Sequence, residues 1–125
     1  MKTMILALTL LGSVSMAFAV EVDQTYVNFG SESWMTGAPQ TQFVTVTNDS
    51  TQTLGPLEVA SNCFLPDFNI GAGCDSQTLQ ANEACQIMIT FKPSHQGLFN
   101  CTIRVGAANA QGESDILVSG EGSSI

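Results

Sequence analysis

The chain has 125 residues, which is enough for one domain with a modest hydrophobic core. Only 11% of the residues are charged, and eleven acidic side chains against three basic ones give a formal net charge of −8. Nucleic acids and anionic membrane surfaces are bound by clustered Lys and Arg, so the sequence excludes a basic face for either partner. The three basic residues, Lys2, Lys92 and Arg104, are scattered along the chain.

The first nineteen residues have the three parts of a secretory signal peptide. Lys2 supplies a positive start, and residues 4–11 form an apolar core too short to span a bilayer of about 30 Å. Ala17-Phe18-Ala19 matches the small-x-small pattern of a signal peptidase site. We therefore expect 1–19 to be a signal peptide cleaved after Ala19, and 20–125 to be a single secreted or periplasmic domain. No later segment approaches the roughly 18 apolar residues of a transmembrane helix, so we expect no membrane span.

The remaining residues alternate between apolar and polar types and contain frequent turn residues, a pattern that favours β-strands over helices. Gly30 is expected to end the first strand, Gly55-Pro56 interrupts the third, and order is expected to fade at 120–122. The clearest alternation occurs in the fifth and sixth strands, where every second residue is apolar. The expected strands are 26–29, 40–48, 54–60, 67–70, 85–91, 99–105 and 114–119.

Seven short strands, with turn signals about every 8–12 residues, are typical of an all-β domain of the sandwich type. Long helical segments, which would connect parallel strands, are not indicated. We therefore predict a seven-stranded antiparallel immunoglobulin-like β-sandwich. We find no internal repeat and no low-complexity linker, so a second domain is not predicted.

A series of motifs resembles the Hydin/ASH-type immunoglobulin-like domains, especially the bacterial secreted versions called choice-of-anchor D. The motifs run in order from Val27-Asn28-Phe29-Gly30 through Thr45-Val46-Thr47-Asn48 to the closing residues 117–122. The most specific one spaces Cys74, Leu79, Cys85 and Pro93 around an alternating strand. The resemblance covers about 26–122. It implies a sandwich that serves as an interaction or spacer module, without catalytic residues or a cofactor.

Four cysteines allow three pairings, and their spacing alone does not choose between them. An exported chain favours disulfides, and zinc sites usually need cysteines about two to four residues apart. The family resemblance implies a Cys74–Cys85 disulfide across the loop that holds Leu79. In an immunoglobulin-like sandwich the third and sixth strands are antiparallel neighbours, which makes Cys63–Cys101 geometrically reasonable.

Residues that could support catalysis or metal binding are sparse. His95 is the only histidine, lies in a predicted turn, and has no Gly-x-Ser-x-Gly motif to accompany it. A copper site from His95 with Met35 or Met88 is only weakly indicated, and the carboxylates form no calcium-loop motif. We therefore expect no enzyme activity, no metal and no cofactor. Asn48 and Asn100 each begin a glycosylation sequon.

Trp34 and Met35 are the sequence-based candidates for partner binding, because Trp is enriched at binding hot spots. They could instead fold over the end of the sandwich as a lid. The sequence favours a secreted or periplasmic, non-catalytic binding module that contacts a protein or a surface glycan. The alternative is a structural subunit that self-assembles into a filament or surface layer by edge-strand pairing.

Overall fold

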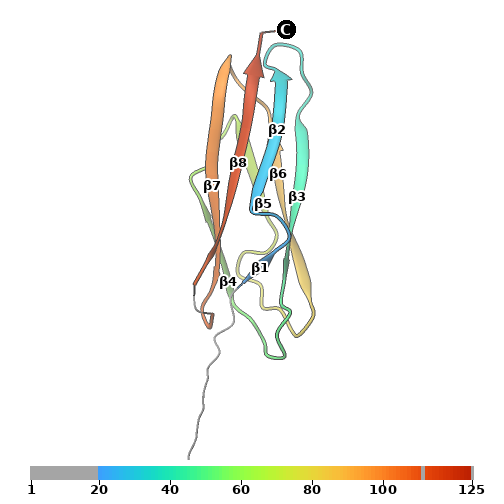
Figure 1. The fold of residues 1–125 in the computed structure, drawn as a ribbon, viewed down its shortest axis with the longest axis vertical. Coiled ribbons are helices and arrows are strands. Elements are labelled where there is room, and N and C mark those ends of the chain that lie inside the picture. Colours follow the sequence, from blue (N-terminus) through green and yellow to red (C-terminus); the bar gives the residue numbers. More distant parts are fainter. Residues whose placement is uncertain (1–19, 111, 125) are drawn as a thin grey trace, which may run out of the picture.

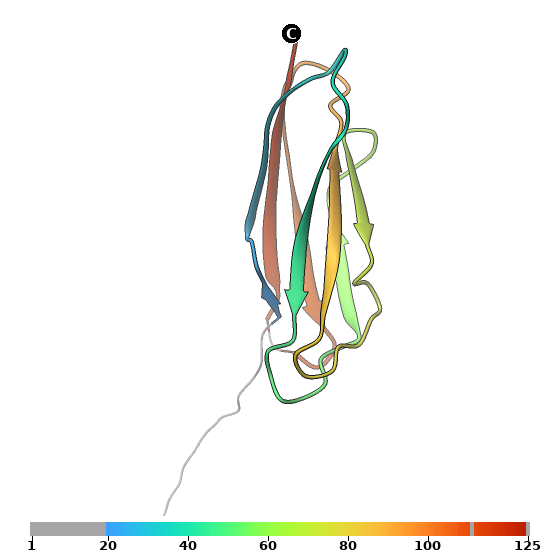
Figure 2. The same ribbon diagram turned by 90° about the vertical axis from the view of Figure 1, so that its right-hand side faces the viewer.

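The computed structural model describes residues 20–110 and 112–124, so the predicted signal peptide lies outside the described residues. Two four-stranded sheets with orders β1-β3-β6-β5 and β2-β8-β7-β4 face each other along the long axis of the domain (Figures 1 and 2). The predicted all-β sandwich is confirmed. Its strands are β1 (Glu21–Val22), β2 (Tyr26–Ser33), β3 (Gln40–Thr47), β4 (Leu57–Ser61), β5 (Phe68–Ala72), β6 (Ala84–Phe91), β7 (Gly97–Ala107) and β8 (Ser114–Ser123).

The strand count and the purely antiparallel pairing differ from the prediction. The described residues form eight strands, because Glu21–Val22 pairs with the end of β3. A two-residue strand has no periodicity that a sequence could reveal. In addition, β2 pairs with β8 in parallel, with Tyr26 opposite Leu117. Between β1 and β2 the chain crosses from one sheet to the other. In the first sheet β1 is antiparallel to β3, and in the second β2 is parallel to β8.

Two glycine positions that were expected to end strands lie inside them. Gly30 has a φ of +73°, which glycine adopts readily, and it lies in a bulge between Asn28 and Ser31, so β2 continues to Ser33. At the other position, β8 continues through Gly120 to Ser123. A Cβ atom at Gly120 would lie 2.6 Å from the Phe91 ring. Glycine is needed there for close packing and does not mark the loss of order.

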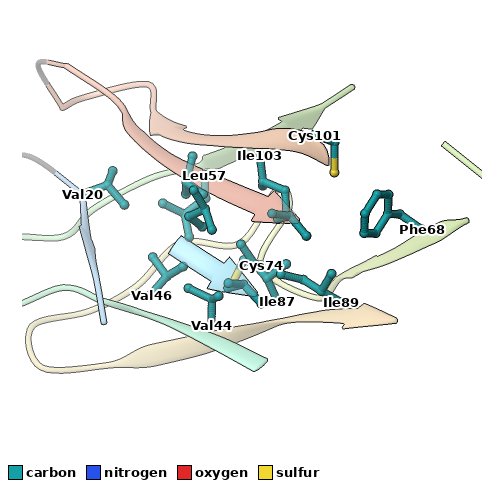
Figure 3. Close-up of a cluster of buried hydrophobic side chains, with 14 of the residues drawn as sticks. Val20, Val44, Val46, Leu57, Phe68, Cys74, Ile87, Ile89, Cys101 and Ile103 are labelled. Carbon is teal, nitrogen blue, oxygen red and sulfur yellow. The ribbon is translucent and has the colours of Figure 1, made fainter. Parts of the chain in front are cut away.

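The core consists of the inward-facing side chains of both sheets (Figure 3). The predicted inward faces of β6 and β7 are confirmed, with Ile87, Ile89, Ile103 and Val105 fully buried. Phe91, also fully buried, lies among three aromatic rings at centroid distances between 5.1 and 5.8 Å. These rings belong to Phe29, Phe68 and Phe99, so the aromatic cluster joins strands of both sheets.

Asn48, at the end of β3, organises the loops at one end of the sandwich. Its side chain is 2% exposed, and Nδ2 donates to the carbonyl oxygens of Gln52 (2.6 Å) and Leu79 (3.0 Å). Its Oδ1 accepts hydrogen bonds from the backbone N–H and the hydroxyl of Ser50. This burial leaves no room for a glycan on Asn48 in the folded domain, whereas Asn100 of the second sequon is exposed on β7.

Asn48→Asp is expected to destabilise the domain by about 3 kcal/mol or more at pH 7, because a buried carboxylate would face two carbonyl oxygens that lose their donor. The loss should be smaller at acid pH, where a protonated carboxyl group can again donate one hydrogen bond. Urea denaturation at both pH values measures the effect. Asn69→Asp, at an exposed position of β5, is the matched control and should change stability by less than about 0.5 kcal/mol. Equal losses in both variants would contradict this role of Asn48.

Candidate interaction site

Two disulfides join edge strands to their neighbours. The β4–β7 ladder ends at Ser61 opposite Ile103, and two residues beyond this pair Cys63, in the loop after β4, bonds to Cys101 of β7. In the other sheet, Cys74 bonds to Cys85 in the same relation to the last β5–β6 pair. The Cα atoms of the two pairs are 5.1 and 5.4 Å apart. Two disulfides in a small domain are typical of an oxidising compartment.

The loop at 62–67 connects the two edge strands and is held firmly at both ends. At its start, Asn62 and Thr102 exchange hydrogen bonds of 3.2 and 2.7 Å, next to the Cys63–Cys101 disulfide. At its end, Asp67 accepts hydrogen bonds from the N–H and the hydroxyl of Ser94 at 2.9 and 2.7 Å. The loop therefore leaves the sandwich with a fixed base and projects from its side (Figure 2).

Phe64 and Leu65, at the tip of this loop, are both 72% exposed. The carbonyl of Phe64 accepts a 3.0 Å hydrogen bond from the N–H of Phe68, which closes the loop below the tip. We call Phe64 and Leu65 the apolar knuckle. Sequence reasoning missed it, although two large apolar residues between Cys63 and Pro66, a residue that disfavours strand formation, were an available signal.

Trp34 and Met35 lie in the connection from β2 to β3, close to the C-terminal end of β8 (Figure 1). The Trp34 N–H donates a 3.1 Å hydrogen bond to the carbonyl of Ser123. Trp34 is 39% exposed and Met35 is 66% exposed. Trp34 is therefore only partly covered by the domain, while most of Met35 lies in solvent. Their role in partner binding stays a prediction.

The residues considered for copper binding belong to three different segments: His95 to the β6–β7 turn, Met35 to the β2–β3 connection and Met88 to β6. His95 is exposed, its Nδ1 is 2.9 Å from the carbonyl of Gln96, and its ring contacts Phe99 at 4.7 Å between centroids. Met88 lies on the outer face of β6, opposite Phe43 of β3. Among residues 20–110 and 112–124, no group of three or more His, Cys, Asp or Glu side chains could hold a metal ion.

Arg104, on the outer face of β7, is held by two carboxylates. Its Nε lies 3.0 Å from Asp115 and 3.5 Å from Glu113. The hydrogen bond to Asp115, followed by the charges of Asp115 and Glu113, raises the pKa of Arg104 above its ordinary value. Its charge is therefore neutralised locally, and it offers little to an anionic partner.

Side chains cap several backbone groups on the edge strands β2 and β4 and on the part of β3 that the two-residue β1 leaves uncovered. Such caps occupy hydrogen-bonding groups that could otherwise pair with a strand of another molecule. Each cap therefore hinders the addition of a strand from another molecule at that position. The capped groups are the carbonyl of Phe43 by Gln24, the N–H of Thr45 by Asp23, the carbonyl of Asn28 by Gln42 and the N–H of Val59 by Asp75.

This arrangement of strands can be compared with known proteins. The chain matches no protein-family model and no curated protein sequence. Among solved structures, it superposes on the ASH/PapD-like domain 7 of human CEP192 with a TM-score of 0.68. That match has 13% sequence identity and covers 87% of this chain and 88% of the CEP192 domain. The chain has the ASH/PapD-like fold.

Other structures share this ASH/PapD-like fold. The periplasmic chaperone SfaE matches with a TM-score of 0.60 and 14% identity, over 83% of this chain and 58% of the chaperone. The VesB protease of Vibrio cholerae matches with a TM-score of 0.64 and 18% identity, over 82% of this chain but only 31% of the protease. At such identities the likeness concerns the fold alone.

The part of the chain that the structure describes contains no helix with the length and apolar character of a membrane span.

Proposed function

We propose that this chain is a non-catalytic interaction domain, exported to an oxidising compartment, that binds a protein partner through the apolar knuckle of Phe64 and Leu65. Similarity to an ASH domain and to a periplasmic chaperone supports an interaction role over catalysis. The two disulfides and the predicted signal peptide support export.

The exposure of the knuckle is the observation that carries this proposal. Adjacent apolar side chains at 72% exposure lose contact with water when a partner covers them, which favours binding. Because the disulfide and the Asp67 hydrogen bonds already order the loop base, little backbone entropy is lost on association. The net charge of −8 suits a partner whose apolar pocket has a basic rim.

Replacing both knuckle residues by serine (F64S/L65S) is expected to reduce recovery of the partner at least about tenfold, the equivalent of about 1.4 kcal/mol. The tagged, oxidised domain is used to capture proteins from the extracytoplasmic fraction of the source organism, and the bound partner is quantified by mass spectrometry. The melting temperature should change little, since substitutions at exposed sites alter stability by about 0.5 kcal/mol or less.

Trp34→Ala is the comparison variant in this experiment. If Trp34 mainly covers the end of the sandwich, W34A lowers the melting temperature and keeps the partner. Loss of the partner with W34A and its retention with F64S/L65S would contradict the knuckle and favour Trp34 and Met35 as the anchor. Retention of the partner with both variants would also contradict the proposal.

Self-assembly through edge strands has less support. The caps on β2, β3 and β4 occupy groups that an added strand would need. Of the remaining edges, β5 has only five residues and its first N–H is bonded to Phe64. Short and capped edges are a common means by which proteins avoid edge-to-edge pairing.

A further inference from the structure

A groove of about 380 Å³ lies on the outer face of the β2-β8-β7 sheet, away from the knuckle. The ladder registers arrange the outward side chains of these three strands in rows, and the groove is lined by residues from each row. The middle row is entirely polar and uncharged, whereas each outer row contains an apolar side chain. The rows are Tyr26–Leu117–Thr102, Asn28–Ser119–Asn100 and Ser31–Glu121–Leu98.

The bulge in β2 makes this part of the sheet hollow. Between Asn28 and Ser31 the register shifts, and Gly30 contributes no side chain to the surface. A Cβ atom at Gly30 would meet no heavy atom within 4 Å, so the space above it is open. Bulges commonly redirect side chains next to functional sites. Here the bulge lowers one wall of the groove beside Asn28.

Tyr26 forms an aromatic platform at one end of the groove. Its side chain is 55% exposed, and its hydroxyl shares a 2.9 Å hydrogen bond with the hydroxyl of Ser119. Ser119 lies one row away on the neighbouring strand, so this bond holds the ring across the sheet surface. A ring fixed in this way offers an apolar surface to a ligand without first losing rotational freedom.

Two amide side chains lie beside the platform with unused hydrogen-bonding groups. The Oδ1 atom of Asn28 accepts bonds from Gly30 N–H and the Ser119 hydroxyl, which directs Nδ2 to other partners. Asn100 is exposed, and its side chain makes no hydrogen bond to the part of the chain that the structure describes. Glu121 adds a carboxylate acceptor opposite Leu98.

We propose that this groove binds a neutral oligosaccharide. Pyranose rings have an apolar C–H face that suits the Tyr26 ring, and their hydroxyl groups both donate and accept, which suits two amides and a carboxylate. Anionic glycans fit poorly because Glu121 would repel them and Arg104 is engaged by Asp115 and Glu113. An apolar peptide would desolvate the polar middle row without providing partners for it.

This site goes beyond the proposed protein interaction and uses different residues. It is tested by isothermal titration of the mature domain with maltohexaose, cellohexaose, chitohexaose and mannohexaose, with a hyaluronan hexasaccharide as the anionic probe. We expect at least one neutral probe to bind with a dissociation constant of about 1 mM or tighter. Tyr26→Ala and Asn100→Ala should each weaken that binding at least about tenfold, and Tyr26→Phe, which keeps the ring, should weaken it less.

Phe43→Ala is the matched control, because Phe43 is an exposed aromatic residue on the other sheet. It should leave binding unchanged, as should F64S/L65S, which separates this site from the knuckle. The proposal is overturned if no neutral probe binds, if only the hyaluronan probe binds, or if Phe43→Ala weakens binding as much as Tyr26→Ala does. Circular dichroism establishes that each variant is folded.

Discussion

Reduction of both disulfides is expected to unfold the domain at temperatures at which the oxidised protein remains folded. The Cys63–Cys101 bond spans a sequence separation of 38 and the Cys74–Cys85 bond one of 11. Loop-closure entropy in the unfolded chain assigns about 4 and about 3 kcal/mol to them. Small domains have only about 5–15 kcal/mol of net stability, so losing both removes a large part of it.

Differential scanning calorimetry with and without reductant measures this effect, and two paired variants separate the bonds. C63A/C101A should melt at a lower temperature than C74A/C85A, because its bond closes the longer loop. C63A/C101A should also loosen the base of the knuckle. If the reduced and oxidised proteins melt at the same temperature, the disulfides do not stabilise this fold.

Phe91→Ala is expected to destabilise the domain by about 3–5 kcal/mol, the range for deleting a buried Phe side chain. Phe91 is fully buried at the end of β6 and contacts the rings of Phe29, Phe68 and Phe99. Its ring also packs against the backbone of Gly120 in the opposite sheet. Because neighbours on two sheets surround it, the cavity cannot collapse without moving one sheet relative to the other.

Urea denaturation of the wild type, Phe91→Ala and Phe91→Leu gives the size of this loss. Phe91→Leu should cost less, since it retains most of the apolar volume. Phe43→Ala removes the same atoms from an exposed position of β3 and should cost no more than about 1 kcal/mol. A loss for Phe91→Ala as small as that for Phe43→Ala would show that the aromatic cluster does not hold the sheets together.

Local patterns predicted the interior well and the strand ends poorly. Alternation placed Ile87, Ile89, Ile103 and Val105 inward because a strand's side chains point to opposite faces with a period of two. Glycine is ambiguous, because the same residue ends a strand, permits a positive φ or allows close packing. The predicted ends at Gly30 and at 120–122 were therefore wrong, and β2 and β8 continue to Ser33 and Ser123.

The sequence and the structure point to different candidate surfaces. Trp34 and Met35 were chosen for their residue types, whereas exposure depends on what the fold places over each side chain. The structure leaves Trp34 39% and Met35 66% exposed, and it also exposes Phe64 and Leu65, which their residue types alone had not singled out. The groove could not be predicted from the sequence, because Tyr26 and Ser119 are 93 residues apart and meet only through the parallel pairing of β2 and β8.

The sequence by itself determined the all-β class, the inward faces of the main strands and the acidic balance, because composition and period-two alternation are properties of neighbouring residues. The tertiary structure decided the parallel β2–β8 pairing, the disulfide partners and the surfaces available for binding. Each of these depends on which distant strands become neighbours. That choice follows from burying both sheets' apolar faces at once, a condition that no single segment of the chain contains.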